Sequence, residues 1–166
     1  MGSLSGRSKE FLKKQQAAPE SDLFAAQLNA TPDTSNSKSF PGGDCFTLKS
    51  GVKVTNTQQT KPCGITLFTE QPRMTIVAFM QEGSFATLED DSGVKMRKLN
   101  TDLYTEKTKD INGKKFTIFR LKDEAKYESS AFTLLKGSLF AVSITSNTNE
   151  DLDPKLLSVI TSVEFK

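Results

Sequence analysis

The sequence predicts an α+β fold: an antiparallel β-sheet with a packed C-terminal helix, preceded by a flexible, partly helical N-terminal segment. From residue 45 onward, short apolar runs alternate with turn residues, which is typical of strands. Near the C-terminus, apolar residues recur at three- and four-residue spacing, which indicates one amphipathic helix. The stretches between the expected strands are too short for parallel crossovers, except across residues 81–103. Strands followed by one packing helix favour an α+β layer architecture.

The composition divides the 166 residues into a flexible N-terminal segment with a linker, 1–43, and an α+β domain, 44–166. Hydrophobic residues make up 36% of the chain and are sparse in its first forty residues, so the first part lacks the composition of a core. Residues 8–28 contain helix formers interrupted by Pro19, which fits either a partner-binding helix or a fraying tail. Residues 29–43 are rich in Asn, Ser, Thr, Pro and Gly, which is typical of a linker.

The strands follow from the apolar runs and from the turns between them. Asn112–Gly113 is the signal of a type I′ hairpin turn, and Lys136–Gly137 separates a second pair of runs. The run 74–80 is almost wholly apolar and predicts a central strand that is buried on both faces. Residues 84–100 fit a strand or a helix equally well around an expected turn at Asp90–Gly93. Strands are expected at residues 45–48, 52–54, 64–69, 74–80, 104–111, 114–121, 127–135 and 138–145.

The C-terminal helix is the clearest helix of the chain. Asn149, Glu150 and Asp151 supply N-cap chemistry and acidic residues at its expected start. Its apolar stripe should pack on the sheet. The stripe consists of Leu152, Leu156, Val159, Ile160 and Val163.

Charge and histidine content exclude several function classes. The net charge is +2, without the basic excess that nucleic-acid binding needs. The chain has no histidine, which excludes Ser-His-Asp and Cys-His catalysis and histidine-based zinc sites. No phosphate loop or dinucleotide fingerprint is present, so no cofactor is expected. The sequence contains no run of about 18 apolar residues, so no transmembrane segment is predicted. The start Met1–Ser3 is typical of an added expression start, so a native signal or anchor is expected to be missing.

Cys45 and Cys63 are the only cysteines, and each stands just after a loop, at the start of an expected strand. If the intervening segment runs out and back, both cysteines return to the same edge of the sheet and can form a disulfide. A disulfide would place the protein outside the reducing cytosol. The alternative is two reduced cysteines that pack as small hydrophobic residues.

The remaining candidate sites are clusters of charged residues. Glu89, Asp90 and Asp91 could hold a hard cation or supply an acid/base pair, but the same residues also suit a solvated turn. A possible interaction patch for an anionic partner, or else the solvated face of strands, is formed by Lys95, Arg97 and Lys98. The lysines near this patch in sequence, which could extend it, are Lys107, Lys109, Lys114 and Lys115. The tripeptide Asn29-Ala30-Thr31 matches the N-glycosylation sequon and is followed by Pro32.

The last third of the chain resembles PsbP-like domains. The resemblance rests on the Ile111–Gly113 hairpin, the strand from Phe140 to Ile144 and the closing stretch from Ile160 to Phe165. It implies an α/β/α sandwich built on an antiparallel sheet. It also implies an exported or organelle-lumen protein that acts as a non-catalytic assembly or binding module. No functional residue is carried over from the family.

The sequence therefore predicts a non-catalytic extracytoplasmic binding or assembly module, with a protein or cell-envelope partner and no nucleic acid. One alternative is a small carboxylate-dependent hydrolase, since glycosidase chemistry needs no histidine. A domain of about 120 residues leaves little room for a deep catalytic cleft beside a core. The other alternative is a cytosolic protein-interaction adaptor with reduced cysteines.

Overall fold

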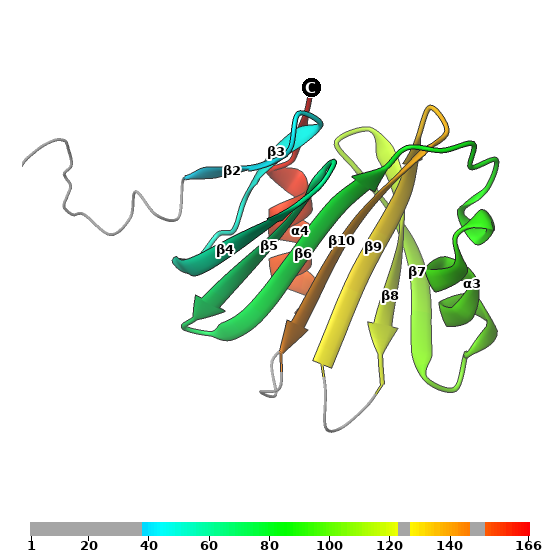
Figure 1. The fold of residues 1–166 in the computed structure, drawn as a ribbon. Helices are drawn as coiled ribbons and strands as arrows, with labels where there is room; N and C mark the ends of the chain where they lie inside the picture. Colours follow the sequence, from blue (N-terminus) through cyan, green and yellow to red (C-terminus); the bar gives the residue numbers. More distant parts are fainter. Residues whose placement is uncertain (1–37, 123–126, 147–151) are drawn as a thin grey trace, which may run out of the picture. The chain divides into compact units, whose positions relative to one another are not determined.

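The structure is a computed structural model that describes residues 38–122, 127–146 and 152–166 (Figure 1). The helical pieces expected within residues 8–28, the sequon at 29–31 and the cap expected at 149–151 lie outside the described residues. Residues 39–49 and 55–166 form one compact unit, to which the following paragraphs apply. Residues 50–54 group with the N-terminal segment, and there the Val52 amide donates to Ser50 Oγ at 3.3 Å.

A seven-stranded sheet dominates the unit, in the order β4-β5-β6-β10-β9-β8-β7. The pairings from β5 to β7 along this order are all antiparallel, as the sequence predicts. The expected hairpins are confirmed: Asn112 and Gly113 join β7 to β8, and Lys136 and Gly137 join β9 to β10. The strands are β4 (Val54–Thr60), β5 (Gly64–Glu70), β6 (Arg73–Gln81), β7 (Tyr104–Ile111), β8 (Lys114–Leu121), β9 (Tyr127–Leu135) and β10 (Ser138–Ser146).

A second, three-stranded sheet has the order β11-β3-β2 and joins β2 (Ser39–Gly42), β3 (Phe46–Lys49) and β11 (Glu164–Phe165). The prediction that the linker 29–43 extends through residues 39–42 is wrong, because these residues form β2. Residues 39–42 pair with β3 in antiparallel register, and Phe40 is buried. Burying Phe40 fixes this strand despite its turn-forming neighbours, because packing overrides local composition.

The C-terminal helix α4 (Asp153–Thr161) confirms the predicted stripe. Leu156, Val159 and Ile160 are at most 2% exposed. Pro154 stands in its first turn, where a missing amide hydrogen costs nothing. The helix contacts β3, β9 and β10, so it joins the two sheets through its apolar side.

The two helices lie on opposite faces of the main sheet, because successive residues of a strand point to opposite faces. On β10, Phe140 packs edge-on against Phe46 and Phe165 of the small sheet, with ring centroids 5.1 and 4.9 Å apart. The next residue, Ala141, belongs to a cluster with Val94 of helix α3 (Ser92–Leu99). Figure 1 shows α4 behind the strands and α3 beside β7. The layers are thus helix with small sheet, main sheet, and second helix.

Residues 84–100 contain a short 3-10 helix (Leu88–Asp90) followed by α3. The expected turn at Asp90–Gly93 is therefore wrong, because Asp91 serves as the N-cap of α3. Its Oδ2 accepts a hydrogen bond from the Val94 amide at 3.0 Å. The sequence Asp-x-x-Val combines a cap residue with one buried apolar residue that packs against the sheet.

The run 74–80 forms most of β6, but the prediction that both of its faces are buried is wrong. Met74, Ile76 and Ala78 are at most 2% exposed, whereas Val77 is 36% exposed. The cluster around α3 covers β8, β9 and the start of β10 and includes Phe79, but it does not include Val77. One apolar strand is therefore partly open to solvent on the α3 face.

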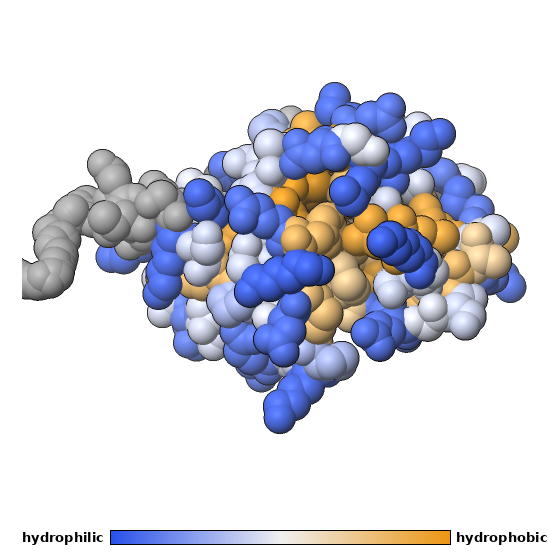
Figure 2. Space-filling model, turned by 90° about the horizontal axis from the view of Figure 1, so that it is seen from above, coloured by the Kyte–Doolittle hydropathy of each residue, from blue (hydrophilic) through white to orange (hydrophobic). Residues whose placement is uncertain are grey.

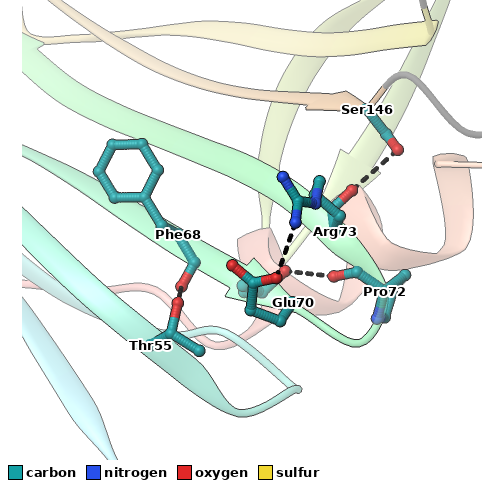
Figure 3. A network of polar contacts seen from close by, with 7 residues as sticks. Thr55, Phe68, Glu70, Pro72, Arg73 and Ser146 are labelled. Carbon is teal, nitrogen blue, oxygen red and sulfur yellow. Dashed lines mark hydrogen bonds and ion pairs between the residues drawn. The ribbon is translucent and has the colours of Figure 1, made fainter.

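Polar contacts fasten the far end of the β5–β6 hairpin (Figure 3). Arg73 pairs with Glu70 at 3.1 Å, and the Arg73 carbonyl accepts a hydrogen bond from Ser146 of β10 at 2.9 Å. On the other side, Thr55 of β4 donates to the Phe68 carbonyl at 3.0 Å. These bonds connect β4, the β5–β6 hairpin and β10. The candidate site described below lies at the opposite end of this hairpin.

The division between an N-terminal segment and a folded domain stays a prediction. Because β2 begins at Ser39, we now place the boundary at residue 38 instead of residue 43. We expect a chain that starts at Lys38 to melt within about 5 °C of the full-length protein, which corresponds to about 1 kcal/mol. Thermal unfolding followed by circular dichroism measures the difference. A larger drop in Tm would show that the first 37 residues contribute to the stability of the domain.

Candidate functional site

One end of the main sheet gathers several turns. The ladder places Gln81 of β6 opposite Leu139 of β10, next to the β9–β10 turn. The β4–β5 turn lies at the same end, because Gly64 pairs with Phe79. The amide of Phe85 donates to the Gly137 carbonyl at 3.1 Å and holds the chain after β6 against this turn. This end therefore carries loops from three separate parts of the chain.

The predicted disulfide joins the small sheet to this end. Cys45 and Cys63 are bonded, with their Cα atoms 5.9 Å apart, inside the usual range of about 4.4–6.8 Å. Gly43 makes the close approach possible. Its φ is +57°, and a Cβ there would collide with the Pro62 carbonyl oxygen. Only a glycine suits that position, so the Gly-Gly-Asp turn before Cys45 belongs to the junction.

Next to the disulfide lies a cavity of about 690 Å³, which we call the lysine cavity. Three lysines stand around an apolar lining, and the ammonium of Lys114 lies 5.3 Å from the centroid of the Phe165 ring. Phe165 itself packs on Phe140 of β10. The cavity is lined by Asp44, Cys45, Met80, Glu82, Lys114, Leu134, Leu135, Lys136, Phe165 and Lys166.

A second cavity of about 430 Å³, the hairpin cavity, lies on the other side of the disulfide. Cys63 lines it, as Cys45 lines the lysine cavity, and Met80 and Glu82 line both. Its walls are the β4–β5 turn, residues 60–66, and the end of β6, residues 77–82. Val77, the partly exposed residue of β6, belongs to this wall.

Figure 2 looks down on this end of the molecule and shows hydrophobic residues gathered in its middle, with hydrophilic side chains around and across them. Burying such a surface under a ligand would be favourable, because removing apolar area from water contributes roughly 25 cal/mol per Å². An apolar floor with a few polar groups above it is typical of a ligand site.

The residues predicted as an interaction patch lie elsewhere, on α3, so their placement on strands is wrong. Arg97 pairs with Glu128 at 3.4 Å and also lies over the rings of Tyr104 and Phe132, at 5.4 and 5.5 Å. Its side chain is only 14% exposed. The guanidinium thus holds α3 on the sheet. Its role in contacting a partner stays a prediction.

The other two residues of that patch differ from each other. Lys98 donates to Glu106 at 2.8 Å and pairs with Glu89 at 3.3 Å. The hydrogen bond with Glu106 raises the pKa of Lys98 against the opposing effect of burial, and Glu89 adds to the rise. Lys95 is exposed. Two of the three cations are therefore paired with carboxylates, which reduces the positive field of the predicted patch.

The acidic cluster at residues 89–91 has structural roles in the structure. Asp90 Oδ2 accepts hydrogen bonds from the amides of Ala86 and Thr87 at 2.8 and 3.1 Å, and Asp91 caps α3. Among the described residues, no group of three or more His, Cys, Asp or Glu side chains could hold a metal ion. The three carboxylates are used in caps and an ion pair rather than in a shared site.

A polar cluster anchors the start of α4 to three neighbouring strands. Asp153 accepts a hydrogen bond from Ser129 of β9 at 2.7 Å and pairs with Lys107 of β7 at 3.2 Å and Arg120 of β8 at 3.7 Å. Burial, the largest single effect, raises the pKa of Asp153. The hydrogen bonds from Ser129 and Lys107, with the charges of Lys107 and Arg120, outweigh it and lower the pKa below the usual 3.8. The ionised carboxylate therefore stabilises the fold.

Asp153→Asn should lower the free energy of unfolding by about 1–2 kcal/mol near neutral pH, because it removes a charged hydrogen-bond acceptor. Since the folded-state pKa is depressed, this stabilisation is complete above the unfolded pKa and is lost as the pH falls through the folded value. The gap between wild type and variant should therefore close below pH 3.8. Denaturant titrations across this pH range measure it, with Asp102→Asn, in an exposed turn, as control. A gap that stays constant with pH would contradict the assignment.

Sequence reasoning found the disulfide but did not find the cavities beside it. Lys114 and Lys136 stand at or next to hairpin turns, and Lys166 follows β11. The turns were predictable, but their convergence follows from the strand order, which the sequence does not specify. The sequence feature that could have indicated the lysine cavity is a lysine beside each turn at the same end of an antiparallel sheet.

Among the described residues, no helix is both long and apolar enough to cross a membrane.

No protein-family model matches the sequence, and no curated protein matches it. Solved structures do match. One is a protein from Bacteroides thetaiotaomicron VPI-5482, with a TM-score of 0.54 and 13% identity over 78% of this chain. The match covers 48% of the Bacteroides protein, so this chain spans about half its length. Another is the solution structure of cyanobacterial PsbP (CyanoP) from Synechocystis sp. PCC 6803, with a TM-score of 0.54 and 14% identity. That match covers 78% of this chain and 92% of CyanoP.

The fold is PsbP-like. This confirms the resemblance seen at the β7–β8 turn, β10 and the α4–β11 stretch, as well as the α+β class. At 13% and 14% identity the likeness shows the fold and nothing more. Function must therefore be argued from the cavities of this PsbP-like domain and from its own side chains.

Proposed function

We propose that this PsbP-like chain is a non-catalytic binding module that works outside the cytoplasm and holds its ligand at the disulfide end of the sheet. The observation that carries the proposal is the pair of apolar cavities on either side of the Cys45–Cys63 bond. At about 430 and 690 Å³ they fall within the range of small-molecule sites, roughly 300–1,000 Å³.

A binding role suits the chemistry of the lining. The titratable groups of the lysine cavity are three lysines and the carboxylates of Asp44 and Glu82. The sequence has no histidine to serve as a general base near neutral pH. The apolar residues Met80, Leu134 and Leu135 offer surface to a ligand rather than a reacting group. These features support binding over hydrolysis.

A location outside the cytoplasm is supported by the disulfide, since such bonds persist in oxidising compartments. It is tested by intact mass with and without alkylation of protein isolated from its own source under non-reducing conditions. We expect no alkylation of Cys45 or Cys63. Two alkylatable thiols in freshly isolated protein would contradict this part of the proposal and favour a cytosolic adaptor.

The binding role is tested with Nile red, an uncharged apolar dye, titrated into the full chain by fluorescence. Leu135 lines the lysine cavity and is half-buried, so Leu135→Gln should weaken dye binding by about tenfold. The matched control is Leu99→Gln, which changes a leucine that is 73% exposed on α3 and should leave binding unchanged. Absent dye binding, or equal losses in the two variants, would contradict a ligand site at this end.

A further inference from the structure

We propose that the lysine cavity binds a free anionic amphiphile: a molecule of the fatty-acid class, with a carboxylate head and an unbranched apolar chain. This inference rests on the proposed binding function and adds the chemical class of the ligand. It follows from three properties of the cavity, namely its apolar floor, the state of its lysines and the hairpin cavity that adjoins it.

The floor is apolar and accessible. Met80, Leu135 and Phe165 line it, and each is half-buried rather than fully covered. They come from the ends of β6 and β9 and from β11, so they form a surface that the fold itself fixes. Phe165 is held from beneath by Phe140, at 4.9 Å between ring centroids. A hydrocarbon chain laid on this floor would remove apolar area from water on both partners.

The lysines of the cavity lack carboxylate partners among the described residues. Within the part of the chain that the structure describes, no ion pair joins Lys114, Lys136 or Lys166 to a carboxylate. In the described part of the chain, the one ring contact of the three is that of the Lys114 ammonium over Phe165, at 5.3 Å. This placement keeps a cation above the apolar floor, where a ligand's head group would meet it. Lys98 and Lys107 elsewhere on the surface do pair with carboxylates.

The charges of the lining favour an anion. Among the side chains of the lining, three ammonium groups stand against two carboxylates, those of Asp44 and Glu82. A carboxylate head near the lysines would form charge-assisted hydrogen bonds, which are about twice as strong as neutral ones. A cationic head would be repelled by the ammonium groups, and an uncharged head would accept hydrogen bonds from them without the attraction between opposite charges.

The shape of the site favours a chain over a compact ion. Met80 and Glu82 line both cavities, so the two cavities adjoin at the end of β6, beside Cys63. A small polar anion such as phosphate would leave both apolar surfaces exposed to water. An elongated apolar chain covers them while its charged end stays among the lysines.

The test is calorimetric titration of the full chain with decanoate, at concentrations below those at which micelles form. Decanol and decyltrimethylammonium serve as probes of the same chain length with neutral and cationic heads. We expect decanoate to bind about tenfold more tightly than either, the factor that one charge-assisted hydrogen bond supplies. Raising the salt from about 0.05 M to about 0.5 M should weaken decanoate binding and leave decanol binding unchanged, because salt screens the lysines.

The matching variant is Lys114→Gln combined with Lys136→Gln, which replaces both ammonium groups by neutral amides on side chains that are one atom shorter. It should lower decanoate affinity by about tenfold or more and leave decanol affinity unchanged. The control is Lys109→Gln, an exposed lysine of β7 that lies outside both cavities and should bind decanoate as wild type does. Melting temperatures of the three proteins establish that each is folded.

The outcomes separate this inference from the function on which it rests. Equal affinity for decanoate and decanol, or an unchanged decanoate affinity in the double variant, overturns the anionic class while the cavity remains a ligand site. Binding to anionic phosphatidylglycerol vesicles without binding of free decanoate also overturns it, in favour of a membrane surface. If none of the three probes binds, the inference falls, and the Nile red titration decides the proposed function by itself.

Discussion

Leu156→Ala is expected to lower the free energy of unfolding by about 2–5 kcal/mol. Leu156 is completely buried and lies in the middle of the apolar side of α4. Helix α4 contacts β3 of the small sheet and β9 and β10 of the main sheet. Weaker packing of α4 would therefore loosen both sheets at once. A truncated side chain there leaves a cavity that the two sheets cannot close without moving. A loss of this size is a large part of the total stability of a small domain, about 5–15 kcal/mol.

Denaturant unfolding at neutral pH measures this effect. Ser158→Ala is the control, because Ser158 is exposed on the same helix and its replacement should change stability by less than about 0.5 kcal/mol. A loss below about 0.5 kcal/mol for Leu156→Ala would mean that the apolar side of α4 does not carry the core. The joint between the two sheets would then have to depend on the contacts of Phe140 with Phe46 and Phe165 instead.

The parts of the fold that the sequence predicts are those in which local pattern and tertiary packing agree. The hairpin turns at Asn112–Gly113 and Lys136–Gly137 require positive φ, and the structure has φ of 53° and 80° at the first and 52° and 83° at the second. The stripe on α4 likewise has one interpretation, because only a helix brings Leu156, Val159 and Ile160 to one face. In these segments the local chemistry leaves no competing structure.

The parts that the sequence does not predict depend on partners distant in the chain. Strand β4 (Val54–Thr60) is mostly polar and exposed along its length, so its pattern carries no signal of a strand. It is an edge strand, and its structure comes from pairing with β5. In strand β2 the residues beside Phe40 are turn-forming, and the burial of Phe40 fixes the strand. Helix α3 has one buried residue, Val94, which is too little for a periodic pattern.

For the same reason, the sequence predicts the disulfide of the candidate site but not the cavities beside it. The two cysteines are marked by their residue type and by the turns before them, so their pairing could be argued from the sequence. The lysine cavity is made from the ends of β6, β9 and β11, and the ends of β6 and β9 meet only because β10 lies between these strands. That strand order places Met80 near Leu134 without any local signal. The lysines of the cavity are individually ordinary and become a site through this order alone.

The disulfide carries the second large effect, because it closes the segment between two chain positions 18 residues apart. Cys45→Ala combined with Cys63→Ala should lower the free energy of unfolding by about 3 kcal/mol, since the bond no longer restricts the unfolded chain. Cys63 is 6% exposed, so alanine also removes some packing. Denaturant titrations with and without reductant measure the effect, and the double variant should be insensitive to reductant.

The same change should weaken ligand binding, because Cys45 lines the lysine cavity and Cys63 lines the hairpin cavity. Without the bond, the turn at Gly43 is no longer fixed against the Pro62 carbonyl, and the wall between the cavities loses its covalent tie. We expect lower Nile red affinity in the folded double variant and in reduced wild type. A wild-type protein whose stability and dye affinity are both unchanged by reductant would show that the bond supports neither the core nor the site. The ligand end would then depend on the strand ends alone.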